Sequence, residues 1–224
     1  MQRFVAQVTG EAPLLAVNPG GTALPAIDAA AAHGAGALFI DCERTAVGVG
    51  EAAWMARAAR AAGLTVLLRT ESADPAIVIR YLDCRIDALI VPQVESAAAC
   101  AALAALADVH AATAPRTALV AQIESVAGHA ALDEIATAPG IDAILIGPND
   151  LAASMGRPGQ PNDPQVQAAV TDIADRLVAL GRPFGLPVDP GSAGPWARRG
   201  ARLFYLSMPQ LMGLGLAAIR KAVA

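Results

Sequence analysis

Residues 118–146, ALVAQIESVAGHAALDEIATAPGIDAILI, contain the pattern that decides the fold. The run 118–123 is almost wholly apolar, residues 128–137 have the composition of a helix, and the run 143–146 is apolar again. Near-continuous apolar runs are typical of strands that are buried on both faces of a parallel sheet. The stretch therefore predicts a strand, a helix and a second strand parallel to the first.

The same alternation continues in both directions along the chain. Strand-like runs occur at 13–17, 36–40, 65–69, 88–91, 118–123, 143–146, 183–187 and 202–206, and helix-like runs at 22–33, 51–62, 74–83, 96–108, 128–137, 163–181, 191–199 and 209–223. Dividing 224 residues by eight gives about 28 per unit, the size of a strand and its helix. We predict an α/β fold, a (β/α)₈ TIM barrel, with residues 1–224 as a single domain.

A doubly wound open sheet is the alternative architecture. Such a sheet commonly carries a GxGxxG motif after its first strand, whereas residues 17–25 here read VNPGGTALP. The barrel is the favoured prediction.

Composition argues against nucleic-acid and membrane partners. The 16 basic and 20 acidic residues give a formal net charge of −4, whereas a nucleic-acid binder shows a basic face. Aromatic residues, on which the bases of single strands stack, make up only 4% of the chain. No apolar run approaches the roughly 20 residues that span a membrane, and residues 1–13 lack the apolar segment of a secretory signal. The cysteines Cys42, Cys84 and Cys100 have no CxxC spacing, which favours small buried residues in a reduced, cytoplasmic protein.

Polar residues follow several of the predicted strands, where barrel enzymes carry their chemistry. Glu124 and Asp150 come just after neighbouring strands, so their carboxylates can converge on one cation. Oxygen ligands without a nearby His or Cys favour Mg²⁺ or Mn²⁺. The alternative is that either carboxylate caps the next helix, but the presence of Gln122 and of the turn at 147–148 favours the metal site. Trp196 and Tyr205 are interpreted as packing residues.

Arg69 ends an otherwise apolar strand. Because an unpaired buried guanidinium is costly, Arg69 needs an anionic partner. That partner is either a substrate carboxylate or a structural one, Glu71 or Glu43, and the sequence leaves both possibilities open.

Two stretches carry a resemblance to a known family. QIE at 122–124, followed by IDAILIGPNDLAASMG at 141–156, resembles the HpcH/HpaI aldolase and citrate lyase beta family. Shorter matches support it: IDCE at 40–43, LLRTESADP at 67–75, YLD at 81–83 and VPQVES at 91–96. The resemblance implies a (β/α)₈ barrel and a class II, metal-dependent lyase that acts on pyruvate-like 2-oxo acids and aldehydes.

The resemblance also assigns roles to residues. Glu124 and Asp150 would hold the metal, Arg69 would hold the 2-oxo acid and stabilise its enolate, and Gln122 would orient a water or the ketone. Backbone amides near Asn149 and Asp150 would receive the substrate carboxylate. The family further implies a homo-oligomer, a hexamer or a trimer, with C-terminal helices exchanged between neighbours. The apolar stretch 209–219 suits such an exchange and equally suits a helix packed on its own barrel.

One departure from the family concerns proton transfer. Relatives carry a His after the second strand, where this chain has Arg44, while the expected partner of that His, Asp83, is present. An arginine is effectively never deprotonated and so cannot act as a general base. Of the three histidines, His33 and His110 are predicted at the wrong end of the barrel, and His129 is more simply a solvated residue of a first helical turn.

Three functions are compatible with these residues. The first is an aldolase-type lyase that cleaves or forms 4-hydroxy-2-oxo acids. The second is a lyase for citrate-like or acyl-thioester substrates, in which Arg44 would be less anomalous. The third is a non-catalytic 2-oxo-acid-binding relative that lacks the base.

Overall fold

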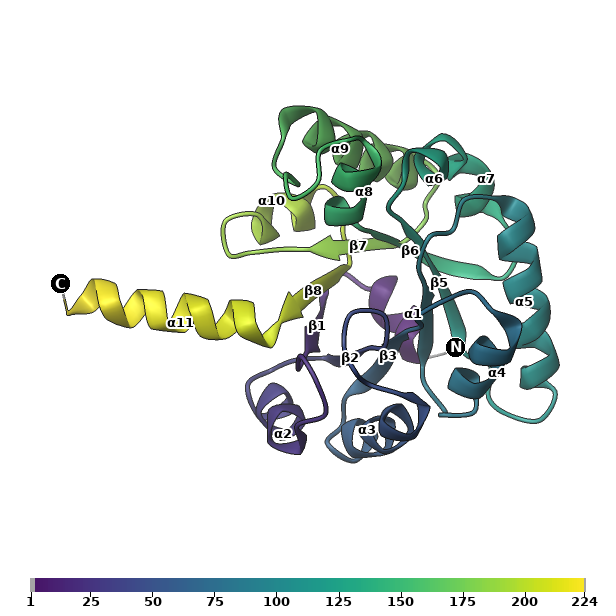
Figure 1. The fold of residues 1–224 in the computed structure, drawn as a ribbon, viewed down its shortest axis with the longest axis horizontal. Helices are drawn as coiled ribbons and strands as arrows, with labels where there is room; N and C mark the ends of the chain where they lie inside the picture. Colours follow the sequence, from purple (N-terminus) through teal and green to yellow (C-terminus); the bar gives the residue numbers. More distant parts are fainter. Residues whose placement is uncertain (1–2, 224) are drawn as a thin grey trace.

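A computed structural model describes residues 3–223. Eight parallel strands form a closed barrel in which each strand pairs with its neighbours along the chain and β8 returns to β1 (Figure 1). The strands are β1 (Leu14–Asn18), β2 (Ala37–Asp41), β3 (Thr65–Arg69), β4 (Ala88–Val91), β5 (Ala118–Ile123), β6 (Ile141–Ile146), β7 (Phe184–Pro187) and β8 (Leu203–Ser207). The closure by β1 and β8 excludes the doubly wound open sheet and confirms the predicted barrel.

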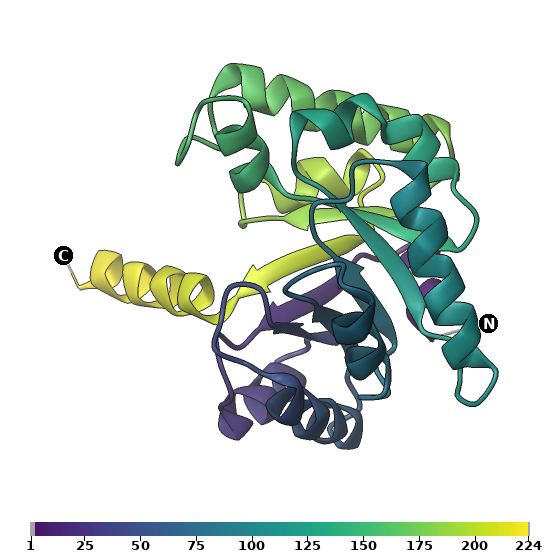
Figure 2. The same cartoon turned by 45° about the vertical axis from the view of Figure 1, so that its right-hand side comes forward.

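Helices cover the outside of this barrel (Figures 1 and 2). The helices of the described chain are α1 (Arg3–Val8), α2 (Leu24–Ala32), α3 (Val49–Ala61), α4 (Pro75–Leu82), α5 (Ala97–Ala111), α6 (Val126–Ala130), α7 (Leu132–Thr137), α8 (Pro148–Ser154), α9 (Pro164–Ala179), α10 (Ala193–Arg198) and α11 (Met208–Ala222). All except α1 and α11 lie on the outside of the barrel. Three details differ from the prediction: α1 precedes the first strand, the helix expected at 128–137 is divided into α6 and α7 at Ala131, and α8 follows β6 ahead of the helix expected at 163–181. No helix within residues 3–223 has the length and apolar character that crossing a membrane requires.

The barrel interior is filled by small and branched side chains of the strands, together with two side chains from α1. Phe4 and Val8 of α1 are buried against the inward-facing residues of the strands, so α1 closes the end of the barrel where the strands begin. At the other end Phe39 is almost fully buried and Tyr205 packs edge-on against it, with ring centroids 4.8 Å apart. The cysteines Cys42, Cys84 and Cys100 are free and buried, as predicted.

The last helix departs from the barrel. α11 extends away from β8 in both views and contains no buried residue (Figures 1 and 2). Its apolar side chains face outward: Met212, Leu214, Leu216 and Ile219 are 39–63% exposed. Of the two expectations for residues 209–219, packing on the chain's own barrel is therefore not found.

Candidate active site

Asp41 and Arg69 form a two-pronged ion pair where β2 and β3 end. These residues are register partners, and Arg69 donates from Nε to Asp41 Oδ1 at 3.0 Å and from Nη2 to Asp41 Oδ2 at 2.7 Å. Arg69 Nη1 also lies 3.0 Å from Glu43 Oε2. The structure thus gives Arg69 structural partners, Asp41 and Glu43, while the other expected partner, Glu71, accepts a hydrogen bond from Tyr81 instead. The Arg69 side chain is only 11% exposed, so this pairing keeps a buried guanidinium compensated.

Arg44 crosses the mouth of the barrel to Asp150. Its Nη2 donates to Asp150 Oδ1 at 2.5 Å, and its backbone N–H donates to Asp41 Oδ1 at 3.2 Å. The Arg44 side chain is 54% exposed, so its guanidinium remains open to solvent and ligands. Arg44 therefore connects the end of β2 to the first turn of α8, the helix that follows β6.

Glu124 is a buried carboxylate just past the end of β5, 1% exposed. Its Oε1 accepts a hydrogen bond from the backbone N–H of Gln93 at 2.9 Å, and its Oε2 accepts one from the side-chain amide of Gln122. Burial raises the pKa of Glu124 to about 7; the bonds from Gln93 and Gln122 lower it, and the nearby charges of Glu43 and Asp150 raise it further. The carboxylate is fixed in place but is costly to ionise without a cation beside it.

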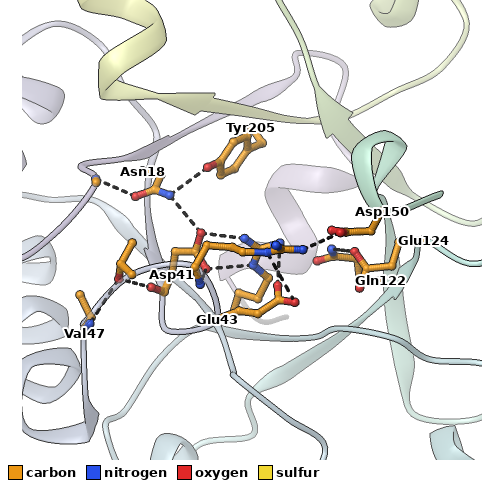
Figure 3. A network of polar contacts seen from close by, with 12 residues as sticks. Asn18, Asp41, Glu43, Val47, Gln122, Glu124, Asp150 and Tyr205 are labelled. Carbon is orange, nitrogen blue, oxygen red and sulfur yellow. Dashed lines mark hydrogen bonds and ion pairs between the residues drawn. The ribbon is translucent and has the colours of Figure 1, made fainter. Parts of the chain in front are cut away.

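The turn from β6 to α8 makes room for this carboxylate. A Cβ atom on Gly147 would lie 2.7 Å from Oε2 and 2.8 Å from Cβ of Glu124, distances that real side chains do not show. Pro148 then starts α8 and brings Asp150 into its first turn. Glycine at 147 is what allows Glu124, Gln122 and Asp150 to occupy one small volume (Figure 3).

Besides Asp41, two further residues complete the site, Asn18 and Tyr205, and the sequence analysis selected neither as a functional residue. Asn18, the last residue of β1, donates from Nδ2 to Asp41 Oδ2 at 3.2 Å and to the hydroxyl of Tyr205 at 2.8 Å (Figure 3). The interpretation of Tyr205 as a packing residue is therefore incomplete: its ring packs on Phe39, but its hydroxyl belongs to the polar network. The signal for Asn18 was its position, because it stands at a strand end that points to the same mouth as Asp41 and Arg69.

These groups surround one cavity of about 370 Å³. This volume is in the range of small-ligand sites. Its lining includes Asn18, Phe39, Asp41, Arg44, Arg69, Gln122, Gly147, Asn149, Asp150, Pro187 and Tyr205. The structure thus brings together the predicted residues Arg44, Arg69, Gln122, Asn149 and Asp150, and places Glu124 against Gln122 at the cavity wall.

The charges at this mouth favour a bound cation. Four carboxylates, those of Asp41, Glu43, Glu124 and Asp150, face only two guanidinium groups, those of Arg44 and Arg69. Gln122 Oε1 is buried and has no hydrogen-bond partner within residues 3–223. Within residues 3–223 no three His, Cys, Asp or Glu side chains gather as a metal site. Carboxylate oxygens are nevertheless the donors that Mg²⁺ takes in small numbers, with water or substrate in the other positions. Glu124 and Asp150 fit a hard divalent cation on these grounds.

Asp83, a predicted site residue, does not line this cavity within the described chain. It follows Leu82 at the end of α4 and lies 3.3 Å from Nε2 of His110. In a (β/α)₈ barrel, helices end on the side where the next strands begin, so a residue at a helix end faces away from the mouth. The expected pairing of Asp83 with the residue at position 44 does not occur within the chain. His129, at the mouth side, is bound to Asp172 at 2.8 Å rather than simply solvated.

A closed (β/α)₈ barrel with acidic and arginine side chains at the carboxyl ends of its strands is the form of many barrel enzymes. Residues 20–189 match the model of the HpcH/HpaI aldolase/citrate lyase family, and the chain belongs to that family.

Two proteins that are similar in sequence to this chain are aldolases. A pyruvate aldolase from Rhizobium etli is 38% identical over 143 residues, which cover 54% of this chain and 56% of that protein. A hydroxypyruvate/pyruvate aldolase from Sagittula stellata is 32% identical over 172 residues, covering 66% of this chain and 68% of that protein. The matched segments thus span about half to two thirds of these relatives.

The fold is shared over a much larger part of the chain. A crystal structure of an HpcH/HpaI aldolase/citrate lyase family protein from Burkholderia cenocepacia superposes with a TM-score of 0.88 and 26% identity, covering 100% of this chain and 98% of that one. The crystal structure of citrate synthase SbnG has a TM-score of 0.86 at 24% identity, covering 97% of both chains, which shows a common fold.

Proposed function

We propose that this chain is a metal-dependent carbon–carbon lyase of the class II aldolase type, which cleaves or forms 4-hydroxy-2-oxo acids through a pyruvate-like enolate. The observation that carries the proposal is that Arg69 and Asp150, after β3 and β6, line one cavity, and that Gln122 of the same lining donates a hydrogen bond to Glu124. The names of the aldolase relatives support this class of reaction.

Glu124 and Asp150 would hold Mg²⁺ or Mn²⁺, and such an ion supplies a Lewis acid for the charge that develops on a 2-oxo acid. The residues around them would bind and orient the substrate. Arg69 uses two N–H donors in its fork with Asp41, and its Nη1 lies 3.0 Å from Glu43 Oε2. A guanidinium has five N–H donors, so two remain for the keto oxygen. Asp41 is a positioning residue here, because it fixes the plane of the Arg69 guanidinium.

Gln122 and the start of α8 would bind the rest of the 2-oxo acid. Gln122 Oε1, buried and unpartnered among residues 3–223, would accept a hydrogen bond from a water or a substrate hydroxyl. Backbone amides at Asn149 and Asp150 would receive the substrate carboxylate, since both residues line the cavity in the first turn of α8.

Arg44 would select an anionic acceptor. It cannot take up a proton, but its guanidinium is half exposed at the cavity and would bind a second carboxylate on the substrate. This same observation favours the second candidate function, a lyase for citrate-like or acyl-thioester substrates. A non-catalytic relative that binds 2-oxo acids is the third, and the experiment below distinguishes all three.

The test is exchange of the methyl protons of pyruvate in D₂O, with and without Mn²⁺, followed by proton NMR. Wild-type exchange that requires the metal and falls about 100-fold or more in Arg69→Lys supports the aldolase, because Arg69→Lys keeps the charge but loses the fork. The matched control is Arg198→Gln on α10, which should exchange like the wild type. Pyruvate binding without exchange identifies the non-catalytic relative, and neither binding nor exchange identifies a different substrate.

We also infer that the chain assembles as a homo-oligomer, a hexamer or a trimer. The support is α11, whose apolar side chains Met212, Leu216 and Ile219 are 50–63% exposed on a helix that leaves the barrel. A second copy of the chain would cover these side chains.

A further inference from the structure

The hydroxyl group of Tyr205 stands at the candidate active site and has no role in the proposed function. Tyr205 lies on β8 and lines the cavity together with Asn18 and Phe39. Its ring is held edge-on against Phe39, while its hydroxyl reaches the polar network at the mouth (Figure 3). What this hydroxyl can do depends on whether it donates or accepts in its hydrogen bond with Asn18.

The side-chain amide of Asn18 has a fixed orientation. The backbone N–H of Gly20 donates to Asn18 Oδ1 at 2.8 Å, so the amide oxygen faces Gly20. The amide nitrogen therefore faces the other way, where it donates to Asp41 Oδ2 at 3.2 Å and to Tyr205 Oη at 2.8 Å. The flipped amide would place its NH₂ group against the N–H of Gly20, donor against donor.

The hydroxyl of Tyr205 must therefore accept in this bond. An amide NH₂ group only donates, whereas a phenol hydroxyl can accept a hydrogen bond and also donate its own hydrogen. Across residues 3–223 that hydrogen is donated to no protein atom. Because Tyr205 lines the cavity, the hydrogen is available to an oxygen atom of a molecule bound there.

The surroundings of Tyr205 keep this hydrogen in place. Burial raises the pKa of Tyr205, the bond from Asn18 lowers it, the charge of Asp41 raises it further and that of Arg69 lowers it, and the net shift is upward. The hydroxyl is therefore a neutral donor at physiological pH. A neutral donor suits a neutral oxygen, a hydroxyl or a carbonyl, whereas a carboxylate is bound more strongly by a guanidinium such as that of Arg44.

We propose that Tyr205 donates a hydrogen bond to the 4-hydroxyl group of a 4-hydroxy-2-oxo acid, the oxygen that the aldehyde contributes. The inference rests on the proposed function, in which Arg69 binds the keto oxygen and the start of α8 binds the carboxylate. The 4-hydroxyl is then the oxygen of this substrate that still needs a donor. Tyr205 is thus a substrate-binding residue that selects for the hydroxyl.

The position of Tyr205 agrees with this assignment. The carboxylates proposed for the metal, Glu124 and Asp150, follow β5 and β6, whereas Tyr205 lies on β8, which pairs with β7 and β1. A substrate bound to the ion through its 2-oxo acid end would direct its other end toward different strands. When the enolate carbon attacks the aldehyde, the carbonyl electron pair moves to the oxygen, and a donor already in place stabilises that charge. The oxygen then takes its proton from water, because Tyr205 keeps its own.

Two unreactive ligands test the contact, 2,4-dihydroxybutyrate and 2-hydroxybutyrate of the same configuration at C2. They differ only in the 4-hydroxyl, so the ratio of their affinities measures what that group contributes. Calorimetry with saturating Mn²⁺ should give a ratio of about threefold to tenfold for the wild type, the value of a neutral hydrogen bond. Tyr205→Phe keeps the ring and removes the donor, and its ratio should fall to about one.

Tyr81→Phe is the matched control. It removes the only other tyrosine hydroxyl, which donates to Glu71 and does not line the cavity, so the wild-type ratio should persist. A wild-type ratio of one, or an unchanged ratio in Tyr205→Phe, would overturn the inference and leave the proposed function intact. Binding of neither ligand to the metal-loaded wild type would overturn both.

A second measurement needs no variant at position 205. Labelling with 3-fluorotyrosine introduces fluorine at two residues, and Tyr81→Phe assigns the ¹⁹F resonance of Tyr205. 2,4-Dihydroxybutyrate should shift this resonance more than 2-hydroxybutyrate does, while the resonance of Tyr81 stays in place. Equal shifts of the Tyr205 resonance with the two ligands would contradict a bond to the 4-hydroxyl.

Discussion

The guanidinium of Arg44 is bonded to the carboxylate of Asp150, with Nη2 2.5 Å from Oδ1. Arg44 stands where relatives are expected to carry a histidine, and Asp150 is one of the two carboxylates assigned to the metal. A fixed positive charge and a divalent cation would therefore share one carboxylate. Under the proposed function, this ion pair would link Arg44 to the metal affinity of the site.

Arg44→Gln should increase the affinity for Mn²⁺. The substitution removes a positive charge beside Asp150 and frees its carboxylate, and exposed ion pairs of this kind are worth up to ~1 kcal/mol, or about fivefold in affinity. Isothermal titration calorimetry measures the change, with Arg198→Gln as the control for loss of charge elsewhere. An affinity equal to or lower than that of the wild type would show that Arg44 does not compete with the ion.

Glu124→Gln and Asp150→Asn should each weaken Mn²⁺ binding by about tenfold or more. Each substitution removes a charged oxygen ligand and keeps the shape of the side chain, and Mg²⁺ and Mn²⁺ bind chiefly through such oxygens. Asp172→Asn is the matched control, because Asp172 pairs with His129 rather than with the site. Unchanged affinity in both site variants would remove the metal assignment.

Mn²⁺ affinity should rise with pH between about pH 6 and pH 8. The pKa of Glu124 is raised to about 7, chiefly by burial, so protons and the ion compete for its carboxylate below that pH. The metal-free protein should show the opposite trend in stability. The folded pKa lies above the unfolded value, so the folded state binds the extra proton between about pH 4.5 and pH 7, and stability falls as pH rises through that window.

Comparison with Glu124→Gln isolates this effect from other titrating groups. Relative to the variant, the metal-free wild type should lose roughly 3 kcal/mol of unfolding free energy across the full window, because one pKa unit corresponds to about 1.4 kcal/mol. Chemical denaturation at a series of pH values gives the difference. Parallel stability curves for the two proteins would mean that Glu124 titrates normally.

Gly147→Ala should displace the Glu124 carboxylate and so weaken the proposed metal site. The added Cβ would lie 2.7 Å from Oε2 and 2.8 Å from Cβ of Glu124, so the carboxylate must move. We expect a loss of Mn²⁺ affinity and about 1–3 kcal/mol of stability, as for other overpacked positions. Gly50→Ala is the control: nothing lies within 4 Å of its Cβ, and in α3 alanine should stabilise slightly. If Gly147→Ala and Gly50→Ala had the same Mn²⁺ affinity and the same stability, the close approach of Gly147 to Glu124 would be contradicted.

The double substitution Met212→Asp/Ile219→Asp should dissociate the proposed oligomer. Both side chains are more than 60% exposed on α11, and burying charge in their place at an interface is costly. Light scattering with size-exclusion chromatography should give a multiple of 22.6 kDa for the wild type and a smaller mass for the variant. Val109→Asp, at a 75% exposed position of α5, should leave the mass unchanged. A monomeric wild type would refute the oligomer.

The strands were predictable because their apolar runs are short and sharply bounded. β3, β4 and β5 coincide with the predicted ranges. β6 begins two residues early, at Ile141, because Asp142 interrupts the apolar run yet serves the sheet: its Oδ2 accepts the backbone N–H of Leu119 at 2.8 Å. α1 was not predicted, since six residues give too short a pattern, and its role depends on Phe4 reaching the barrel interior.

Residues at the mouth of the barrel were predictable where they directly follow a strand. Position alone places Arg69, Gln122 and Asp150 at the mouth, because parallel strands of a barrel end together. Asp83 was assigned through a family motif and lies at a helix end instead. The fork between Arg69 and Asp41 depends on register between neighbouring strands, which the sequence of either strand does not contain.

The pairing of β1 with β8 sets a condition on biosynthesis. Leu14 of β1 pairs with Leu203 of β8. One edge of β1 therefore stays unpaired until the ribosome has made almost the whole chain. At about 5–20 residues per second, that wait lasts on the order of ten seconds or more. A chain cut short before β8 would keep two open strand edges, which are templates for pairing with other chains. Premature termination should therefore yield aggregates for proteases and chaperones to clear, rather than a smaller soluble barrel.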